Sequence, residues 1–285
     1  MRLKIKQADS GFTLIEAVVV IAITGLVAAV TAVFIRRPVQ VYFDTIRRAE
    51  LTDTADSALR RMTRDIQRAL PNSVRITASA SDQFLEFVPM LSAGRYRAET
   101  GGNPAAGNPL DFNNAADNSF DVLGPPITIA AGNFVVVFNL GQPESDVYAG
   151  TSRRAAAAPF GTLNTVTFTP QATPFPFLSF GNRFQIVGTA VSYYCHPDAA
   201  NPANGFLYRY SGYAIPVNQP VTKVALDGLA TGRVLATNVS ACNMTMNPGP
   251  QISLAVLSIR LAVSNNAPTL ETVDLLHQIN VDNTP

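Results

Sequence analysis

One apolar run near the N-terminus restricts most strongly what this chain can fold into. Residues 12–35 read FTLIEAVVVIAITGLVAAVTAVFI, and the basic stretch MRLKIKQADSG precedes them. As a helix, this run would be about 36 Å long, which is enough to cross a bilayer. Its one charged side chain is Glu16. An acid inside a membrane costs up to about 3 kcal/mol, so Glu16 marks a functional position.

Two ordinary interpretations explain part of this run. A secretory signal peptide has an apolar stretch of about 7–15 residues and then a small-residue cleavage site, for which Ala28–Ala32 would be the candidate. The run is longer than that, and a helical pattern continues beyond it. A single-span anchor accounts for the length but gives Glu16 no role unless its carboxylate lies near the headgroups. Basic residues lie on both sides of the run, so they do not determine its orientation.

A third interpretation comes from the hexapeptide GFTLIE at residues 11–16, which resembles the type IV prepilin signature. In that family, a membrane aspartyl peptidase cuts after the glycine and methylates the new N-terminus. The resemblance implies a leader of residues 1–11, cleavage between Gly11 and Phe12, and N-methylation of Phe12. It also implies that Glu16 sets the register of assembly by pairing with the Phe12 ammonium of a neighbouring subunit. A buried carboxylate is tolerated when it is paired, and glycine lets an extended chain enter a protease cleft.

A second helical pattern follows Pro38, where we expect a kink or an interruption because proline lacks the backbone N–H. Apolar residues then recur mainly every three or four positions, namely Ile46, Ala55, Leu59, Met62, Ile66 and Leu70. Arginines lie between them, on a face that either meets solvent or contacts neighbouring pilins. We predict a helix over residues 12–70, about 88 Å long at the standard rise, so its first half must protrude from a compact core.

From residue 73 onward the pattern alternates with a period of two, and Gly, Pro and Asn become frequent. The predicted strands are residues 73–77, 84–88, 134–139, 165–169, 184–194 and 205–210, followed by a hairpin of 252–263 and 271–281 across residues 264–268. Residues 98–119 read as a long surface loop. The expected fold class is therefore α+β, type IV pilin-like, with a long N-terminal helix packed on a β-rich globular head of residues 71–285.

Cys195 and Cys242 are the two cysteines of the chain. Beside an export-type segment, an even pair favours one disulfide in an oxidising compartment. Free or metal-bound thiols remain the alternative, because His196 follows Cys195 directly. A zinc site needs four ligands, however, and besides Cys242 the one further candidate, His277, lies at no recognised spacing.

No catalytic, cofactor-binding or metal site is evident in the sequence. Neither histidine lies in a nucleophile motif, and no glycine-rich phosphate loop or EF-hand pattern occurs. Asp198, Asn201, Asp282 and Asn283 are scattered oxygen donors, which we interpret as turn residues. The formal net charge of +1 gives no field that would attract nucleic acid. We therefore expect a protein that is not an enzyme and needs no cofactor.

Several downstream segments, among them NRFQIVGTAVSYYC (residues 182–195), LYRYSGYAI (207–215) and LLHQINVDN (275–283), resemble the O-type minor pilins of the mannose-sensitive haemagglutinin pilus. These pilins resemble the J-type pseudopilins of type II secretion in size and in having a large β-rich head. The resemblance implies a minor pilin that takes part in pilus assembly and surface attachment. Alternatives are a J-like pseudopilin or a membrane-anchored periplasmic enzyme.

The same resemblance implies partners and a location. The expected partners are the prepilin peptidase and methyltransferase, other major and minor pilins, and the inner-membrane assembly platform. The chain would first be a single-pass inner-membrane protein with its head in the periplasm. It would later belong to a pilus or pseudopilus filament.

Overall fold

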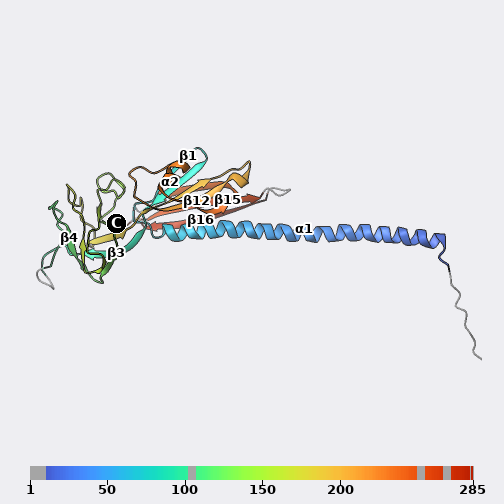
Figure 1. Ribbon diagram of the computed structural model, residues 1–285, viewed down its shortest axis with the longest axis horizontal. Coiled ribbons are helices and arrows are strands. Elements are labelled where there is room, and N and C mark those ends of the chain that lie inside the picture. Colours follow the sequence, from blue (N-terminus) through green and yellow to red (C-terminus); the bar gives the residue numbers. More distant parts are fainter. Residues whose placement is uncertain (1–10, 102–106, 249–253, 266–270, 283, 285) are drawn as a thin grey trace, which may run out of the picture. The chain divides into compact units, whose positions relative to one another are not determined.

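The computed structural model describes residues 11–101, 107–248, 254–265, 271–282 and 284. The chain divides into two compact units, residues 1–50 and 51–285, which are considered separately below. Helix α1 (Leu14–Ile66) begins in the first unit and ends in the second (Figure 1). It continues through Pro38, so the predicted interruption does not occur. A proline removes one hydrogen bond of the helix, and the remaining turns keep theirs.

Helix α1 ends at Ile66, four residues before the predicted end at residue 70. The backbone of the next residues pairs with a distant segment instead of continuing the helix. Ala69 forms a β-bridge with Pro89, and the Leu70 N–H donates to the Val88 carbonyl at 2.8 Å. Because buried backbone groups need partners, this pairing accounts for the earlier helix end.

The described residues of the second unit form four antiparallel sheets. The five-stranded sheet has the order β1 (Arg75–Ser79), β2 (Asp82–Phe87), β11 (Ala190–His196), β12 (Phe206–Tyr213) and β13 (Arg233–Thr237). The six-stranded sheet has the order β7 (Arg153–Ala155), β6 (Phe134–Val136), β10 (Arg183–Val187), β3 (Met90–Tyr96), β4 (Ser119–Leu123) and β9 (Thr165–Thr167). The three-stranded sheet has the order β14 (Val239–Pro248), β15 (Leu254–Asn265) and β16 (Glu271–Asp282), and β5 (Ile127–Ile129) pairs with β8 (Gly161–Leu163). A short helix α2 (Lys223–Leu229) and a 3₁₀ turn (Pro202–Asn204) complete the unit.

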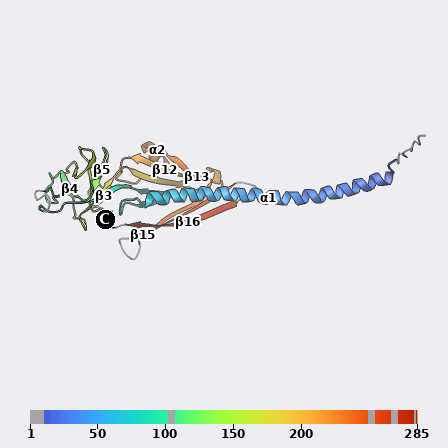
Figure 2. The same ribbon diagram turned by 90° about the horizontal axis from the view of Figure 1, so that it is seen from below.

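Within this unit, the last turns of α1 pack into a core that is shared by the five-stranded and the three-stranded sheet. Seen from below, β12 and β13 lie on one side of α1 and β15 and β16 on the other (Figure 2). Leu59 and Met62 are fully buried there, together with Phe87 of β2 and Val281 of β16. The predicted apolar stripe is confirmed at these helix positions, whereas Ile46, in the first unit, is 37% exposed.

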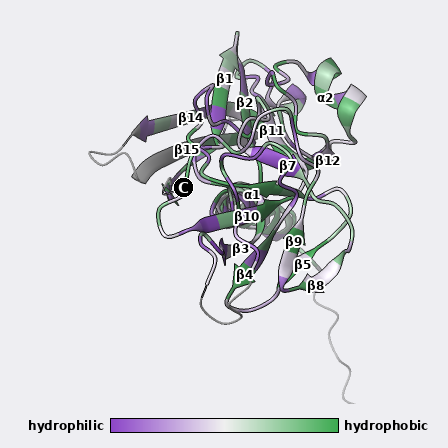
Figure 3. Ribbon diagram, turned by 90° about the vertical axis from the view of Figure 1, so that its left-hand side faces the viewer, coloured by the Kyte–Doolittle hydropathy of each residue, from purple (hydrophilic) through white to green (hydrophobic). Residues whose placement is uncertain are grey.

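The six-stranded sheet lies beyond the end of α1 (Figures 1 and 2) and has a separate apolar core of aromatic and aliphatic side chains. Figure 3 shows apolar and polar residues mixed along the strands of the head, as expected where one strand face is buried and the other is not. The fold class is therefore α+β: a long apolar N-terminal helix followed by a β-rich head, as the sequence predicted.

One predicted strand, residues 184–194, is in fact two strands in different sheets. β10 belongs to the six-stranded sheet and β11 to the five-stranded sheet, and the chain crosses between them at Gly188 and Thr189. The register of pairing shifts on both sides of this crossing. Strands β3, β4, β5, β7, β8, β13 and β14 and helix α2 were not predicted. The predicted loop at residues 98–119 has no strand or helix in its described part before β4, and residues 102–106, like the predicted turn residues 266–268, lie outside the described residues.

Candidate processing and assembly segment

The residues of the predicted cleavage site lie in an exposed segment just ahead of α1. Gly11, Phe12 and Thr13 precede the first helical residue, Leu14, and the Phe12 side chain is 72% exposed. A Cβ placed on Gly11 would meet no other atom within 4 Å, and the backbone of this glycine is not left-handed. Neither packing nor backbone conformation in the described chain therefore requires glycine at this position.

Thr13 starts the helix and is a residue that the sequence analysis missed. Its Oγ1 accepts a hydrogen bond from the Glu16 N–H at 3.3 Å, and its carbonyl accepts the N–H of Ala17 at 3.1 Å. A threonine followed three residues later by a glutamate is the capping-box pattern, so the sequence TLIE carried this signal. The cap leaves Phe12 outside the helix and places Glu16 in its first turn.

Glu16 is an acid in the first turn of α1, on a helix surface that is mainly apolar. The hydroxyls farther along, those of Thr24 and Thr31, donate to the carbonyls of Val20 at 2.6 Å and Val27 at 2.7 Å. Among the described residues, no hydrogen bond or ion pair reaches the Glu16 carboxylate. The apolar part of α1 is exposed and is long and apolar enough to cross a membrane, judged by length and composition alone. The helix thus presents one carboxylate among aliphatic side chains, one turn from the predicted new N-terminus.

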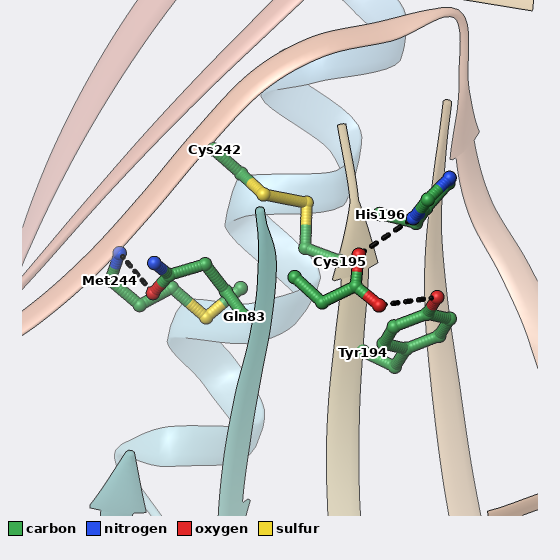
Figure 4. Close-up of a disulfide and its surroundings, with 7 residues drawn as sticks. Gln83, Tyr194, Cys195, His196, Cys242 and Met244 are labelled. Atoms are coloured by element: carbon green, nitrogen blue, oxygen red, sulfur yellow. Dashed lines mark hydrogen bonds and ion pairs between the residues drawn. A yellow bond between two sulfur atoms is a disulfide. The ribbon is translucent and has the colours of Figure 1, made fainter. Parts of the chain in front are cut away.

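The predicted disulfide is confirmed: Cys195 of β11 is bonded to Cys242 of β14 (Figure 4). It joins the five-stranded sheet to the three-stranded sheet. Beside it, the Met244 N–H donates to Gln83 Oε1 at 3.3 Å and links the same two sheets a second time. With both sulfurs in this bond, neither is available as a thiolate ligand, so the metal-site and free-thiol alternatives do not apply here.

The two histidines lie on different strands and contact different aspartates. His196 Nδ1 is 2.6 Å from Asp82 Oδ1, and the Tyr194 hydroxyl donates to the other carboxylate oxygen at 3.0 Å (Figure 4). His277 Nε2 on β16 is 3.9 Å from Asp56 Oδ1 on α1. Within the described part of the chain, no group of three or more His, Cys, Asp or Glu side chains is placed to hold a metal ion.

Asp198, one of the scattered oxygen donors, closes a turn as expected. Its Oδ1 accepts the backbone N–H groups of Ala200 at 3.0 Å and Asn201 at 2.8 Å. These bonds hold the pKa of the Asp198 carboxyl below its usual value, because they stabilise the charged form.

Residues 6–32 match the family model described as the prokaryotic N-terminal methylation motif. In the comparisons with curated proteins and with solved structures, none matches the chain significantly. The motif covers the predicted cleavage site, the capped helix start and most of the apolar run. It implies processing by a prepilin peptidase and assembly with other pilins, and together with the apolar helix it suggests a membrane-anchored protein. The chain is thus consistent with the type IV pilin-like family, as an N-terminally processed protein of the pilin or pseudopilin kind.

Proposed function

We propose that this chain is a minor pilin of an adhesive type IV pilus similar to the mannose-sensitive haemagglutinin pilus. It is cut between Gly11 and Phe12, methylated on Phe12 and assembled through α1. Its role is structural and not catalytic. The observation that carries the proposal is the Glu16 carboxylate, which has no partner among the described residues and lies one helical turn from Phe12 on an exposed apolar helix. In an assembled filament, the Phe12 ammonium of a neighbouring subunit supplies the cation that this carboxylate lacks.

The surroundings of Gly11 support recognition by a protease. Since the described chain has room for a side chain there, the need for glycine is imposed by a partner. An extended, exposed peptide with no side chain at the cleaved position can enter a narrow cleft. We therefore expect Gly11→Leu to accumulate as an uncut, slower-migrating precursor in the membrane. Gly25→Leu is the matched control, because Gly25 also has open space around its Cα yet lies within α1, and it should be processed normally.

Mass spectrometry of the mature N-terminus tests the proposal most directly. The expected first residue is N-methyl-phenylalanine at Phe12. A mature chain that keeps its basic leader, or that begins beyond Ala28, would refute the assignment.

Glu16→Val separates processing from assembly. The variant should be cut and methylated like the wild type, because the peptide bond after Gly11 is unchanged. It should enter filaments poorly, because the neighbour's ammonium then has no carboxylate to pair with. Glu144→Val removes an exposed acid of the head and serves as the control. Normal incorporation of Glu16→Val would overturn the register argument.

The second candidate within the same family is a J-like pseudopilin of type II secretion, since a large head on a pilin-type helix suits both systems. Deletion of the gene distinguishes them. Loss of pili and of surface attachment supports the adhesive pilus, whereas loss of enzyme secretion with intact pili supports the pseudopilus. The third candidate, a membrane-anchored periplasmic enzyme, predicts that the head keeps its function when Gly11→Leu blocks processing.

A further inference from the structure

Two loops that are distant in the chain line an open hollow of about 530 Å³ on the head. One loop supplies Pro109, Leu110 and Phe112, and the other supplies Pro176, Phe177 and Leu178. Ala98, Asp111 and Asn113 complete the lining. Ligand pockets in proteins measure about 300–1,000 Å³ and combine apolar walls with a few polar groups. This hollow has both properties and plays no part in the N-terminal processing described above.

The first wall is held in place by hydrogen bonds and ring packing. The Asp111 N–H donates to Asp117 Oδ2 at 2.8 Å, and the Asn113 N–H donates to Asp111 Oδ1 at 2.8 Å. The ring of Phe112 lies against Tyr96 of β3, with 5.6 Å between their centroids. The loop is therefore fixed to the six-stranded sheet at Phe112, and its polar end is fixed by its own turn.

The second wall is attached to the same tyrosine. The Ser179 N–H donates to the Tyr96 hydroxyl at 3.2 Å, and the ring of Phe177 packs edge-on against Phe138 at 6.4 Å. Tyr96 is fully buried and contacts both walls, so it holds them at a set separation. Because these loops are already held in place, they lose little conformational entropy when a ligand binds.

The lining indicates the charge of the ligand. Asp111 is its one charged residue, and the described residues form no ion pair with the Asp111 carboxylate. Arg154 lines a small cavity next to Asp111, but its guanidinium donates to the carbonyls of Thr151 at 3.1 Å and Thr173 at 2.9 Å. No basic side chain of the described residues lines the hollow, so an anion would form no ion pair there. A cation, in contrast, gains the Asp111 carboxylate, and the lining also holds the aromatic side chains of Phe112 and Phe177.

We propose that this hollow binds an arginine or lysine side chain presented by an extended segment of a partner protein. The aliphatic stem packs between Phe112, Phe177 and Leu178, and the cationic end reaches Asp111. Long basic side chains combine such a stem with a charged tip. Because Asp111 is exposed, the tip keeps part of its water and the segment can continue across the surface of the head.

Binding of a small probe to the full-length protein in detergent micelles tests this site. The probe is N-acetyl-arginine amide, and its neutral analogue N-acetyl-citrulline amide has nearly the same shape. Saturation-transfer NMR should detect transfer from protein rings to the side-chain methylenes of the arginine probe. We expect binding of the citrulline probe, and of either probe to Asp111→Asn, to be about fivefold weaker, as expected for loss of a partly exposed cation contact.

Matched variants keep the test independent of folding and of processing. Glu144→Gln removes an exposed carboxylate from another loop and should bind the arginine probe like the wild type. Asp111→Asn must keep the near-ultraviolet circular dichroism of the wild type, and Phe177→Leu should also weaken binding. Equal binding of both probes, unchanged binding to Asp111→Asn, or binding of a methyl glycoside in place of the arginine probe would overturn the proposal. None of these outcomes depends on cleavage after Gly11, so the site and the pilin assignment can fail separately.

Discussion

Replacement of Asp65 by asparagine should destabilise the head more than any other single change of charge on α1. The Asp65 carboxylate accepts a hydrogen bond from the Tyr193 hydroxyl at 2.9 Å and one from Arg209 Nε at 2.7 Å. It thereby ties the last turn of α1 to the neighbouring strands β11 and β12. Arg61, one turn earlier, approaches the other carboxylate oxygen at 3.3 Å but is half exposed and contributes little.

The magnitude follows from burial. Tyr193 is fully buried, and the side chains of Asp65 and Arg209 are 17% and 16% exposed. A hydrogen bond to a charged group contributes about 1.5–3 kcal/mol, and a buried cation left without its partner costs about 3–5 kcal/mol. Because the pair retains some water and an asparagine oxygen still accepts one bond, we expect Asp65→Asn to lower the free energy of unfolding by about 3 kcal/mol.

The assay is denaturant unfolding followed by the near-ultraviolet circular dichroism of the tyrosines. Asp53→Asn is the matched control, because Asp53 is an exposed acid on the same helix, and it should change the free energy of unfolding by less than about 0.5 kcal/mol. Tyr193→Phe in the Asp65→Asn background should cost less than it does alone, since the two groups share a bond. Equal effects of Asp65→Asn and Asp53→Asn would refute the reasoning.

Three further outcomes are expected. Replacing Cys195 and Cys242 together by alanine should lower the free energy of unfolding by about 4 kcal/mol, which is the loop-closure value for a separation of 47 residues. A reducing agent should destabilise the wild type but leave this variant unchanged. Burial raises the pKa of the Glu86 carboxyl above 4.5 despite its arginine partner. The folded state therefore keeps a proton on Glu86 at pH values where the unfolded chain has lost it, so the free energy of unfolding should fall as pH rises from 4.5 through the raised pKa. Glu86→Gln should remove this slope from unfolding curves measured across the acidic range. Thr13→Ala should speed amide hydrogen exchange at Glu16 about fivefold, because loss of a cap costs about 1 kcal/mol, whereas Thr13→Ser should exchange like the wild type.

The candidate processing segment could be identified from local sequence, because its parts are neighbours in the chain. Gly11, Phe12 and Glu16 lie within six residues, and the long apolar run follows directly. Thr13 was missed as a cap even though its pattern is equally local. The hollow on the head could not be predicted from the sequence, because its two walls lie more than sixty residues apart along the chain and both contact Tyr96 only in the folded head.

The presence of a long N-terminal helix, the β-rich character of the head and the pairing of Cys195 with Cys242 followed from the sequence, since period, composition and cysteine count are local or additive properties. The tertiary structure alone decided where the elements end and which sheet each strand joins. Residues 184–194 read as one strand because both halves are apolar, yet Gly188 and Thr189 carry the chain from one sheet to another. Similarly, α1 stops at Ile66 because the backbone of the following residues pairs with the segment before β3. Such choices depend on hydrogen-bond partners that are remote in sequence, and no local pattern encodes them.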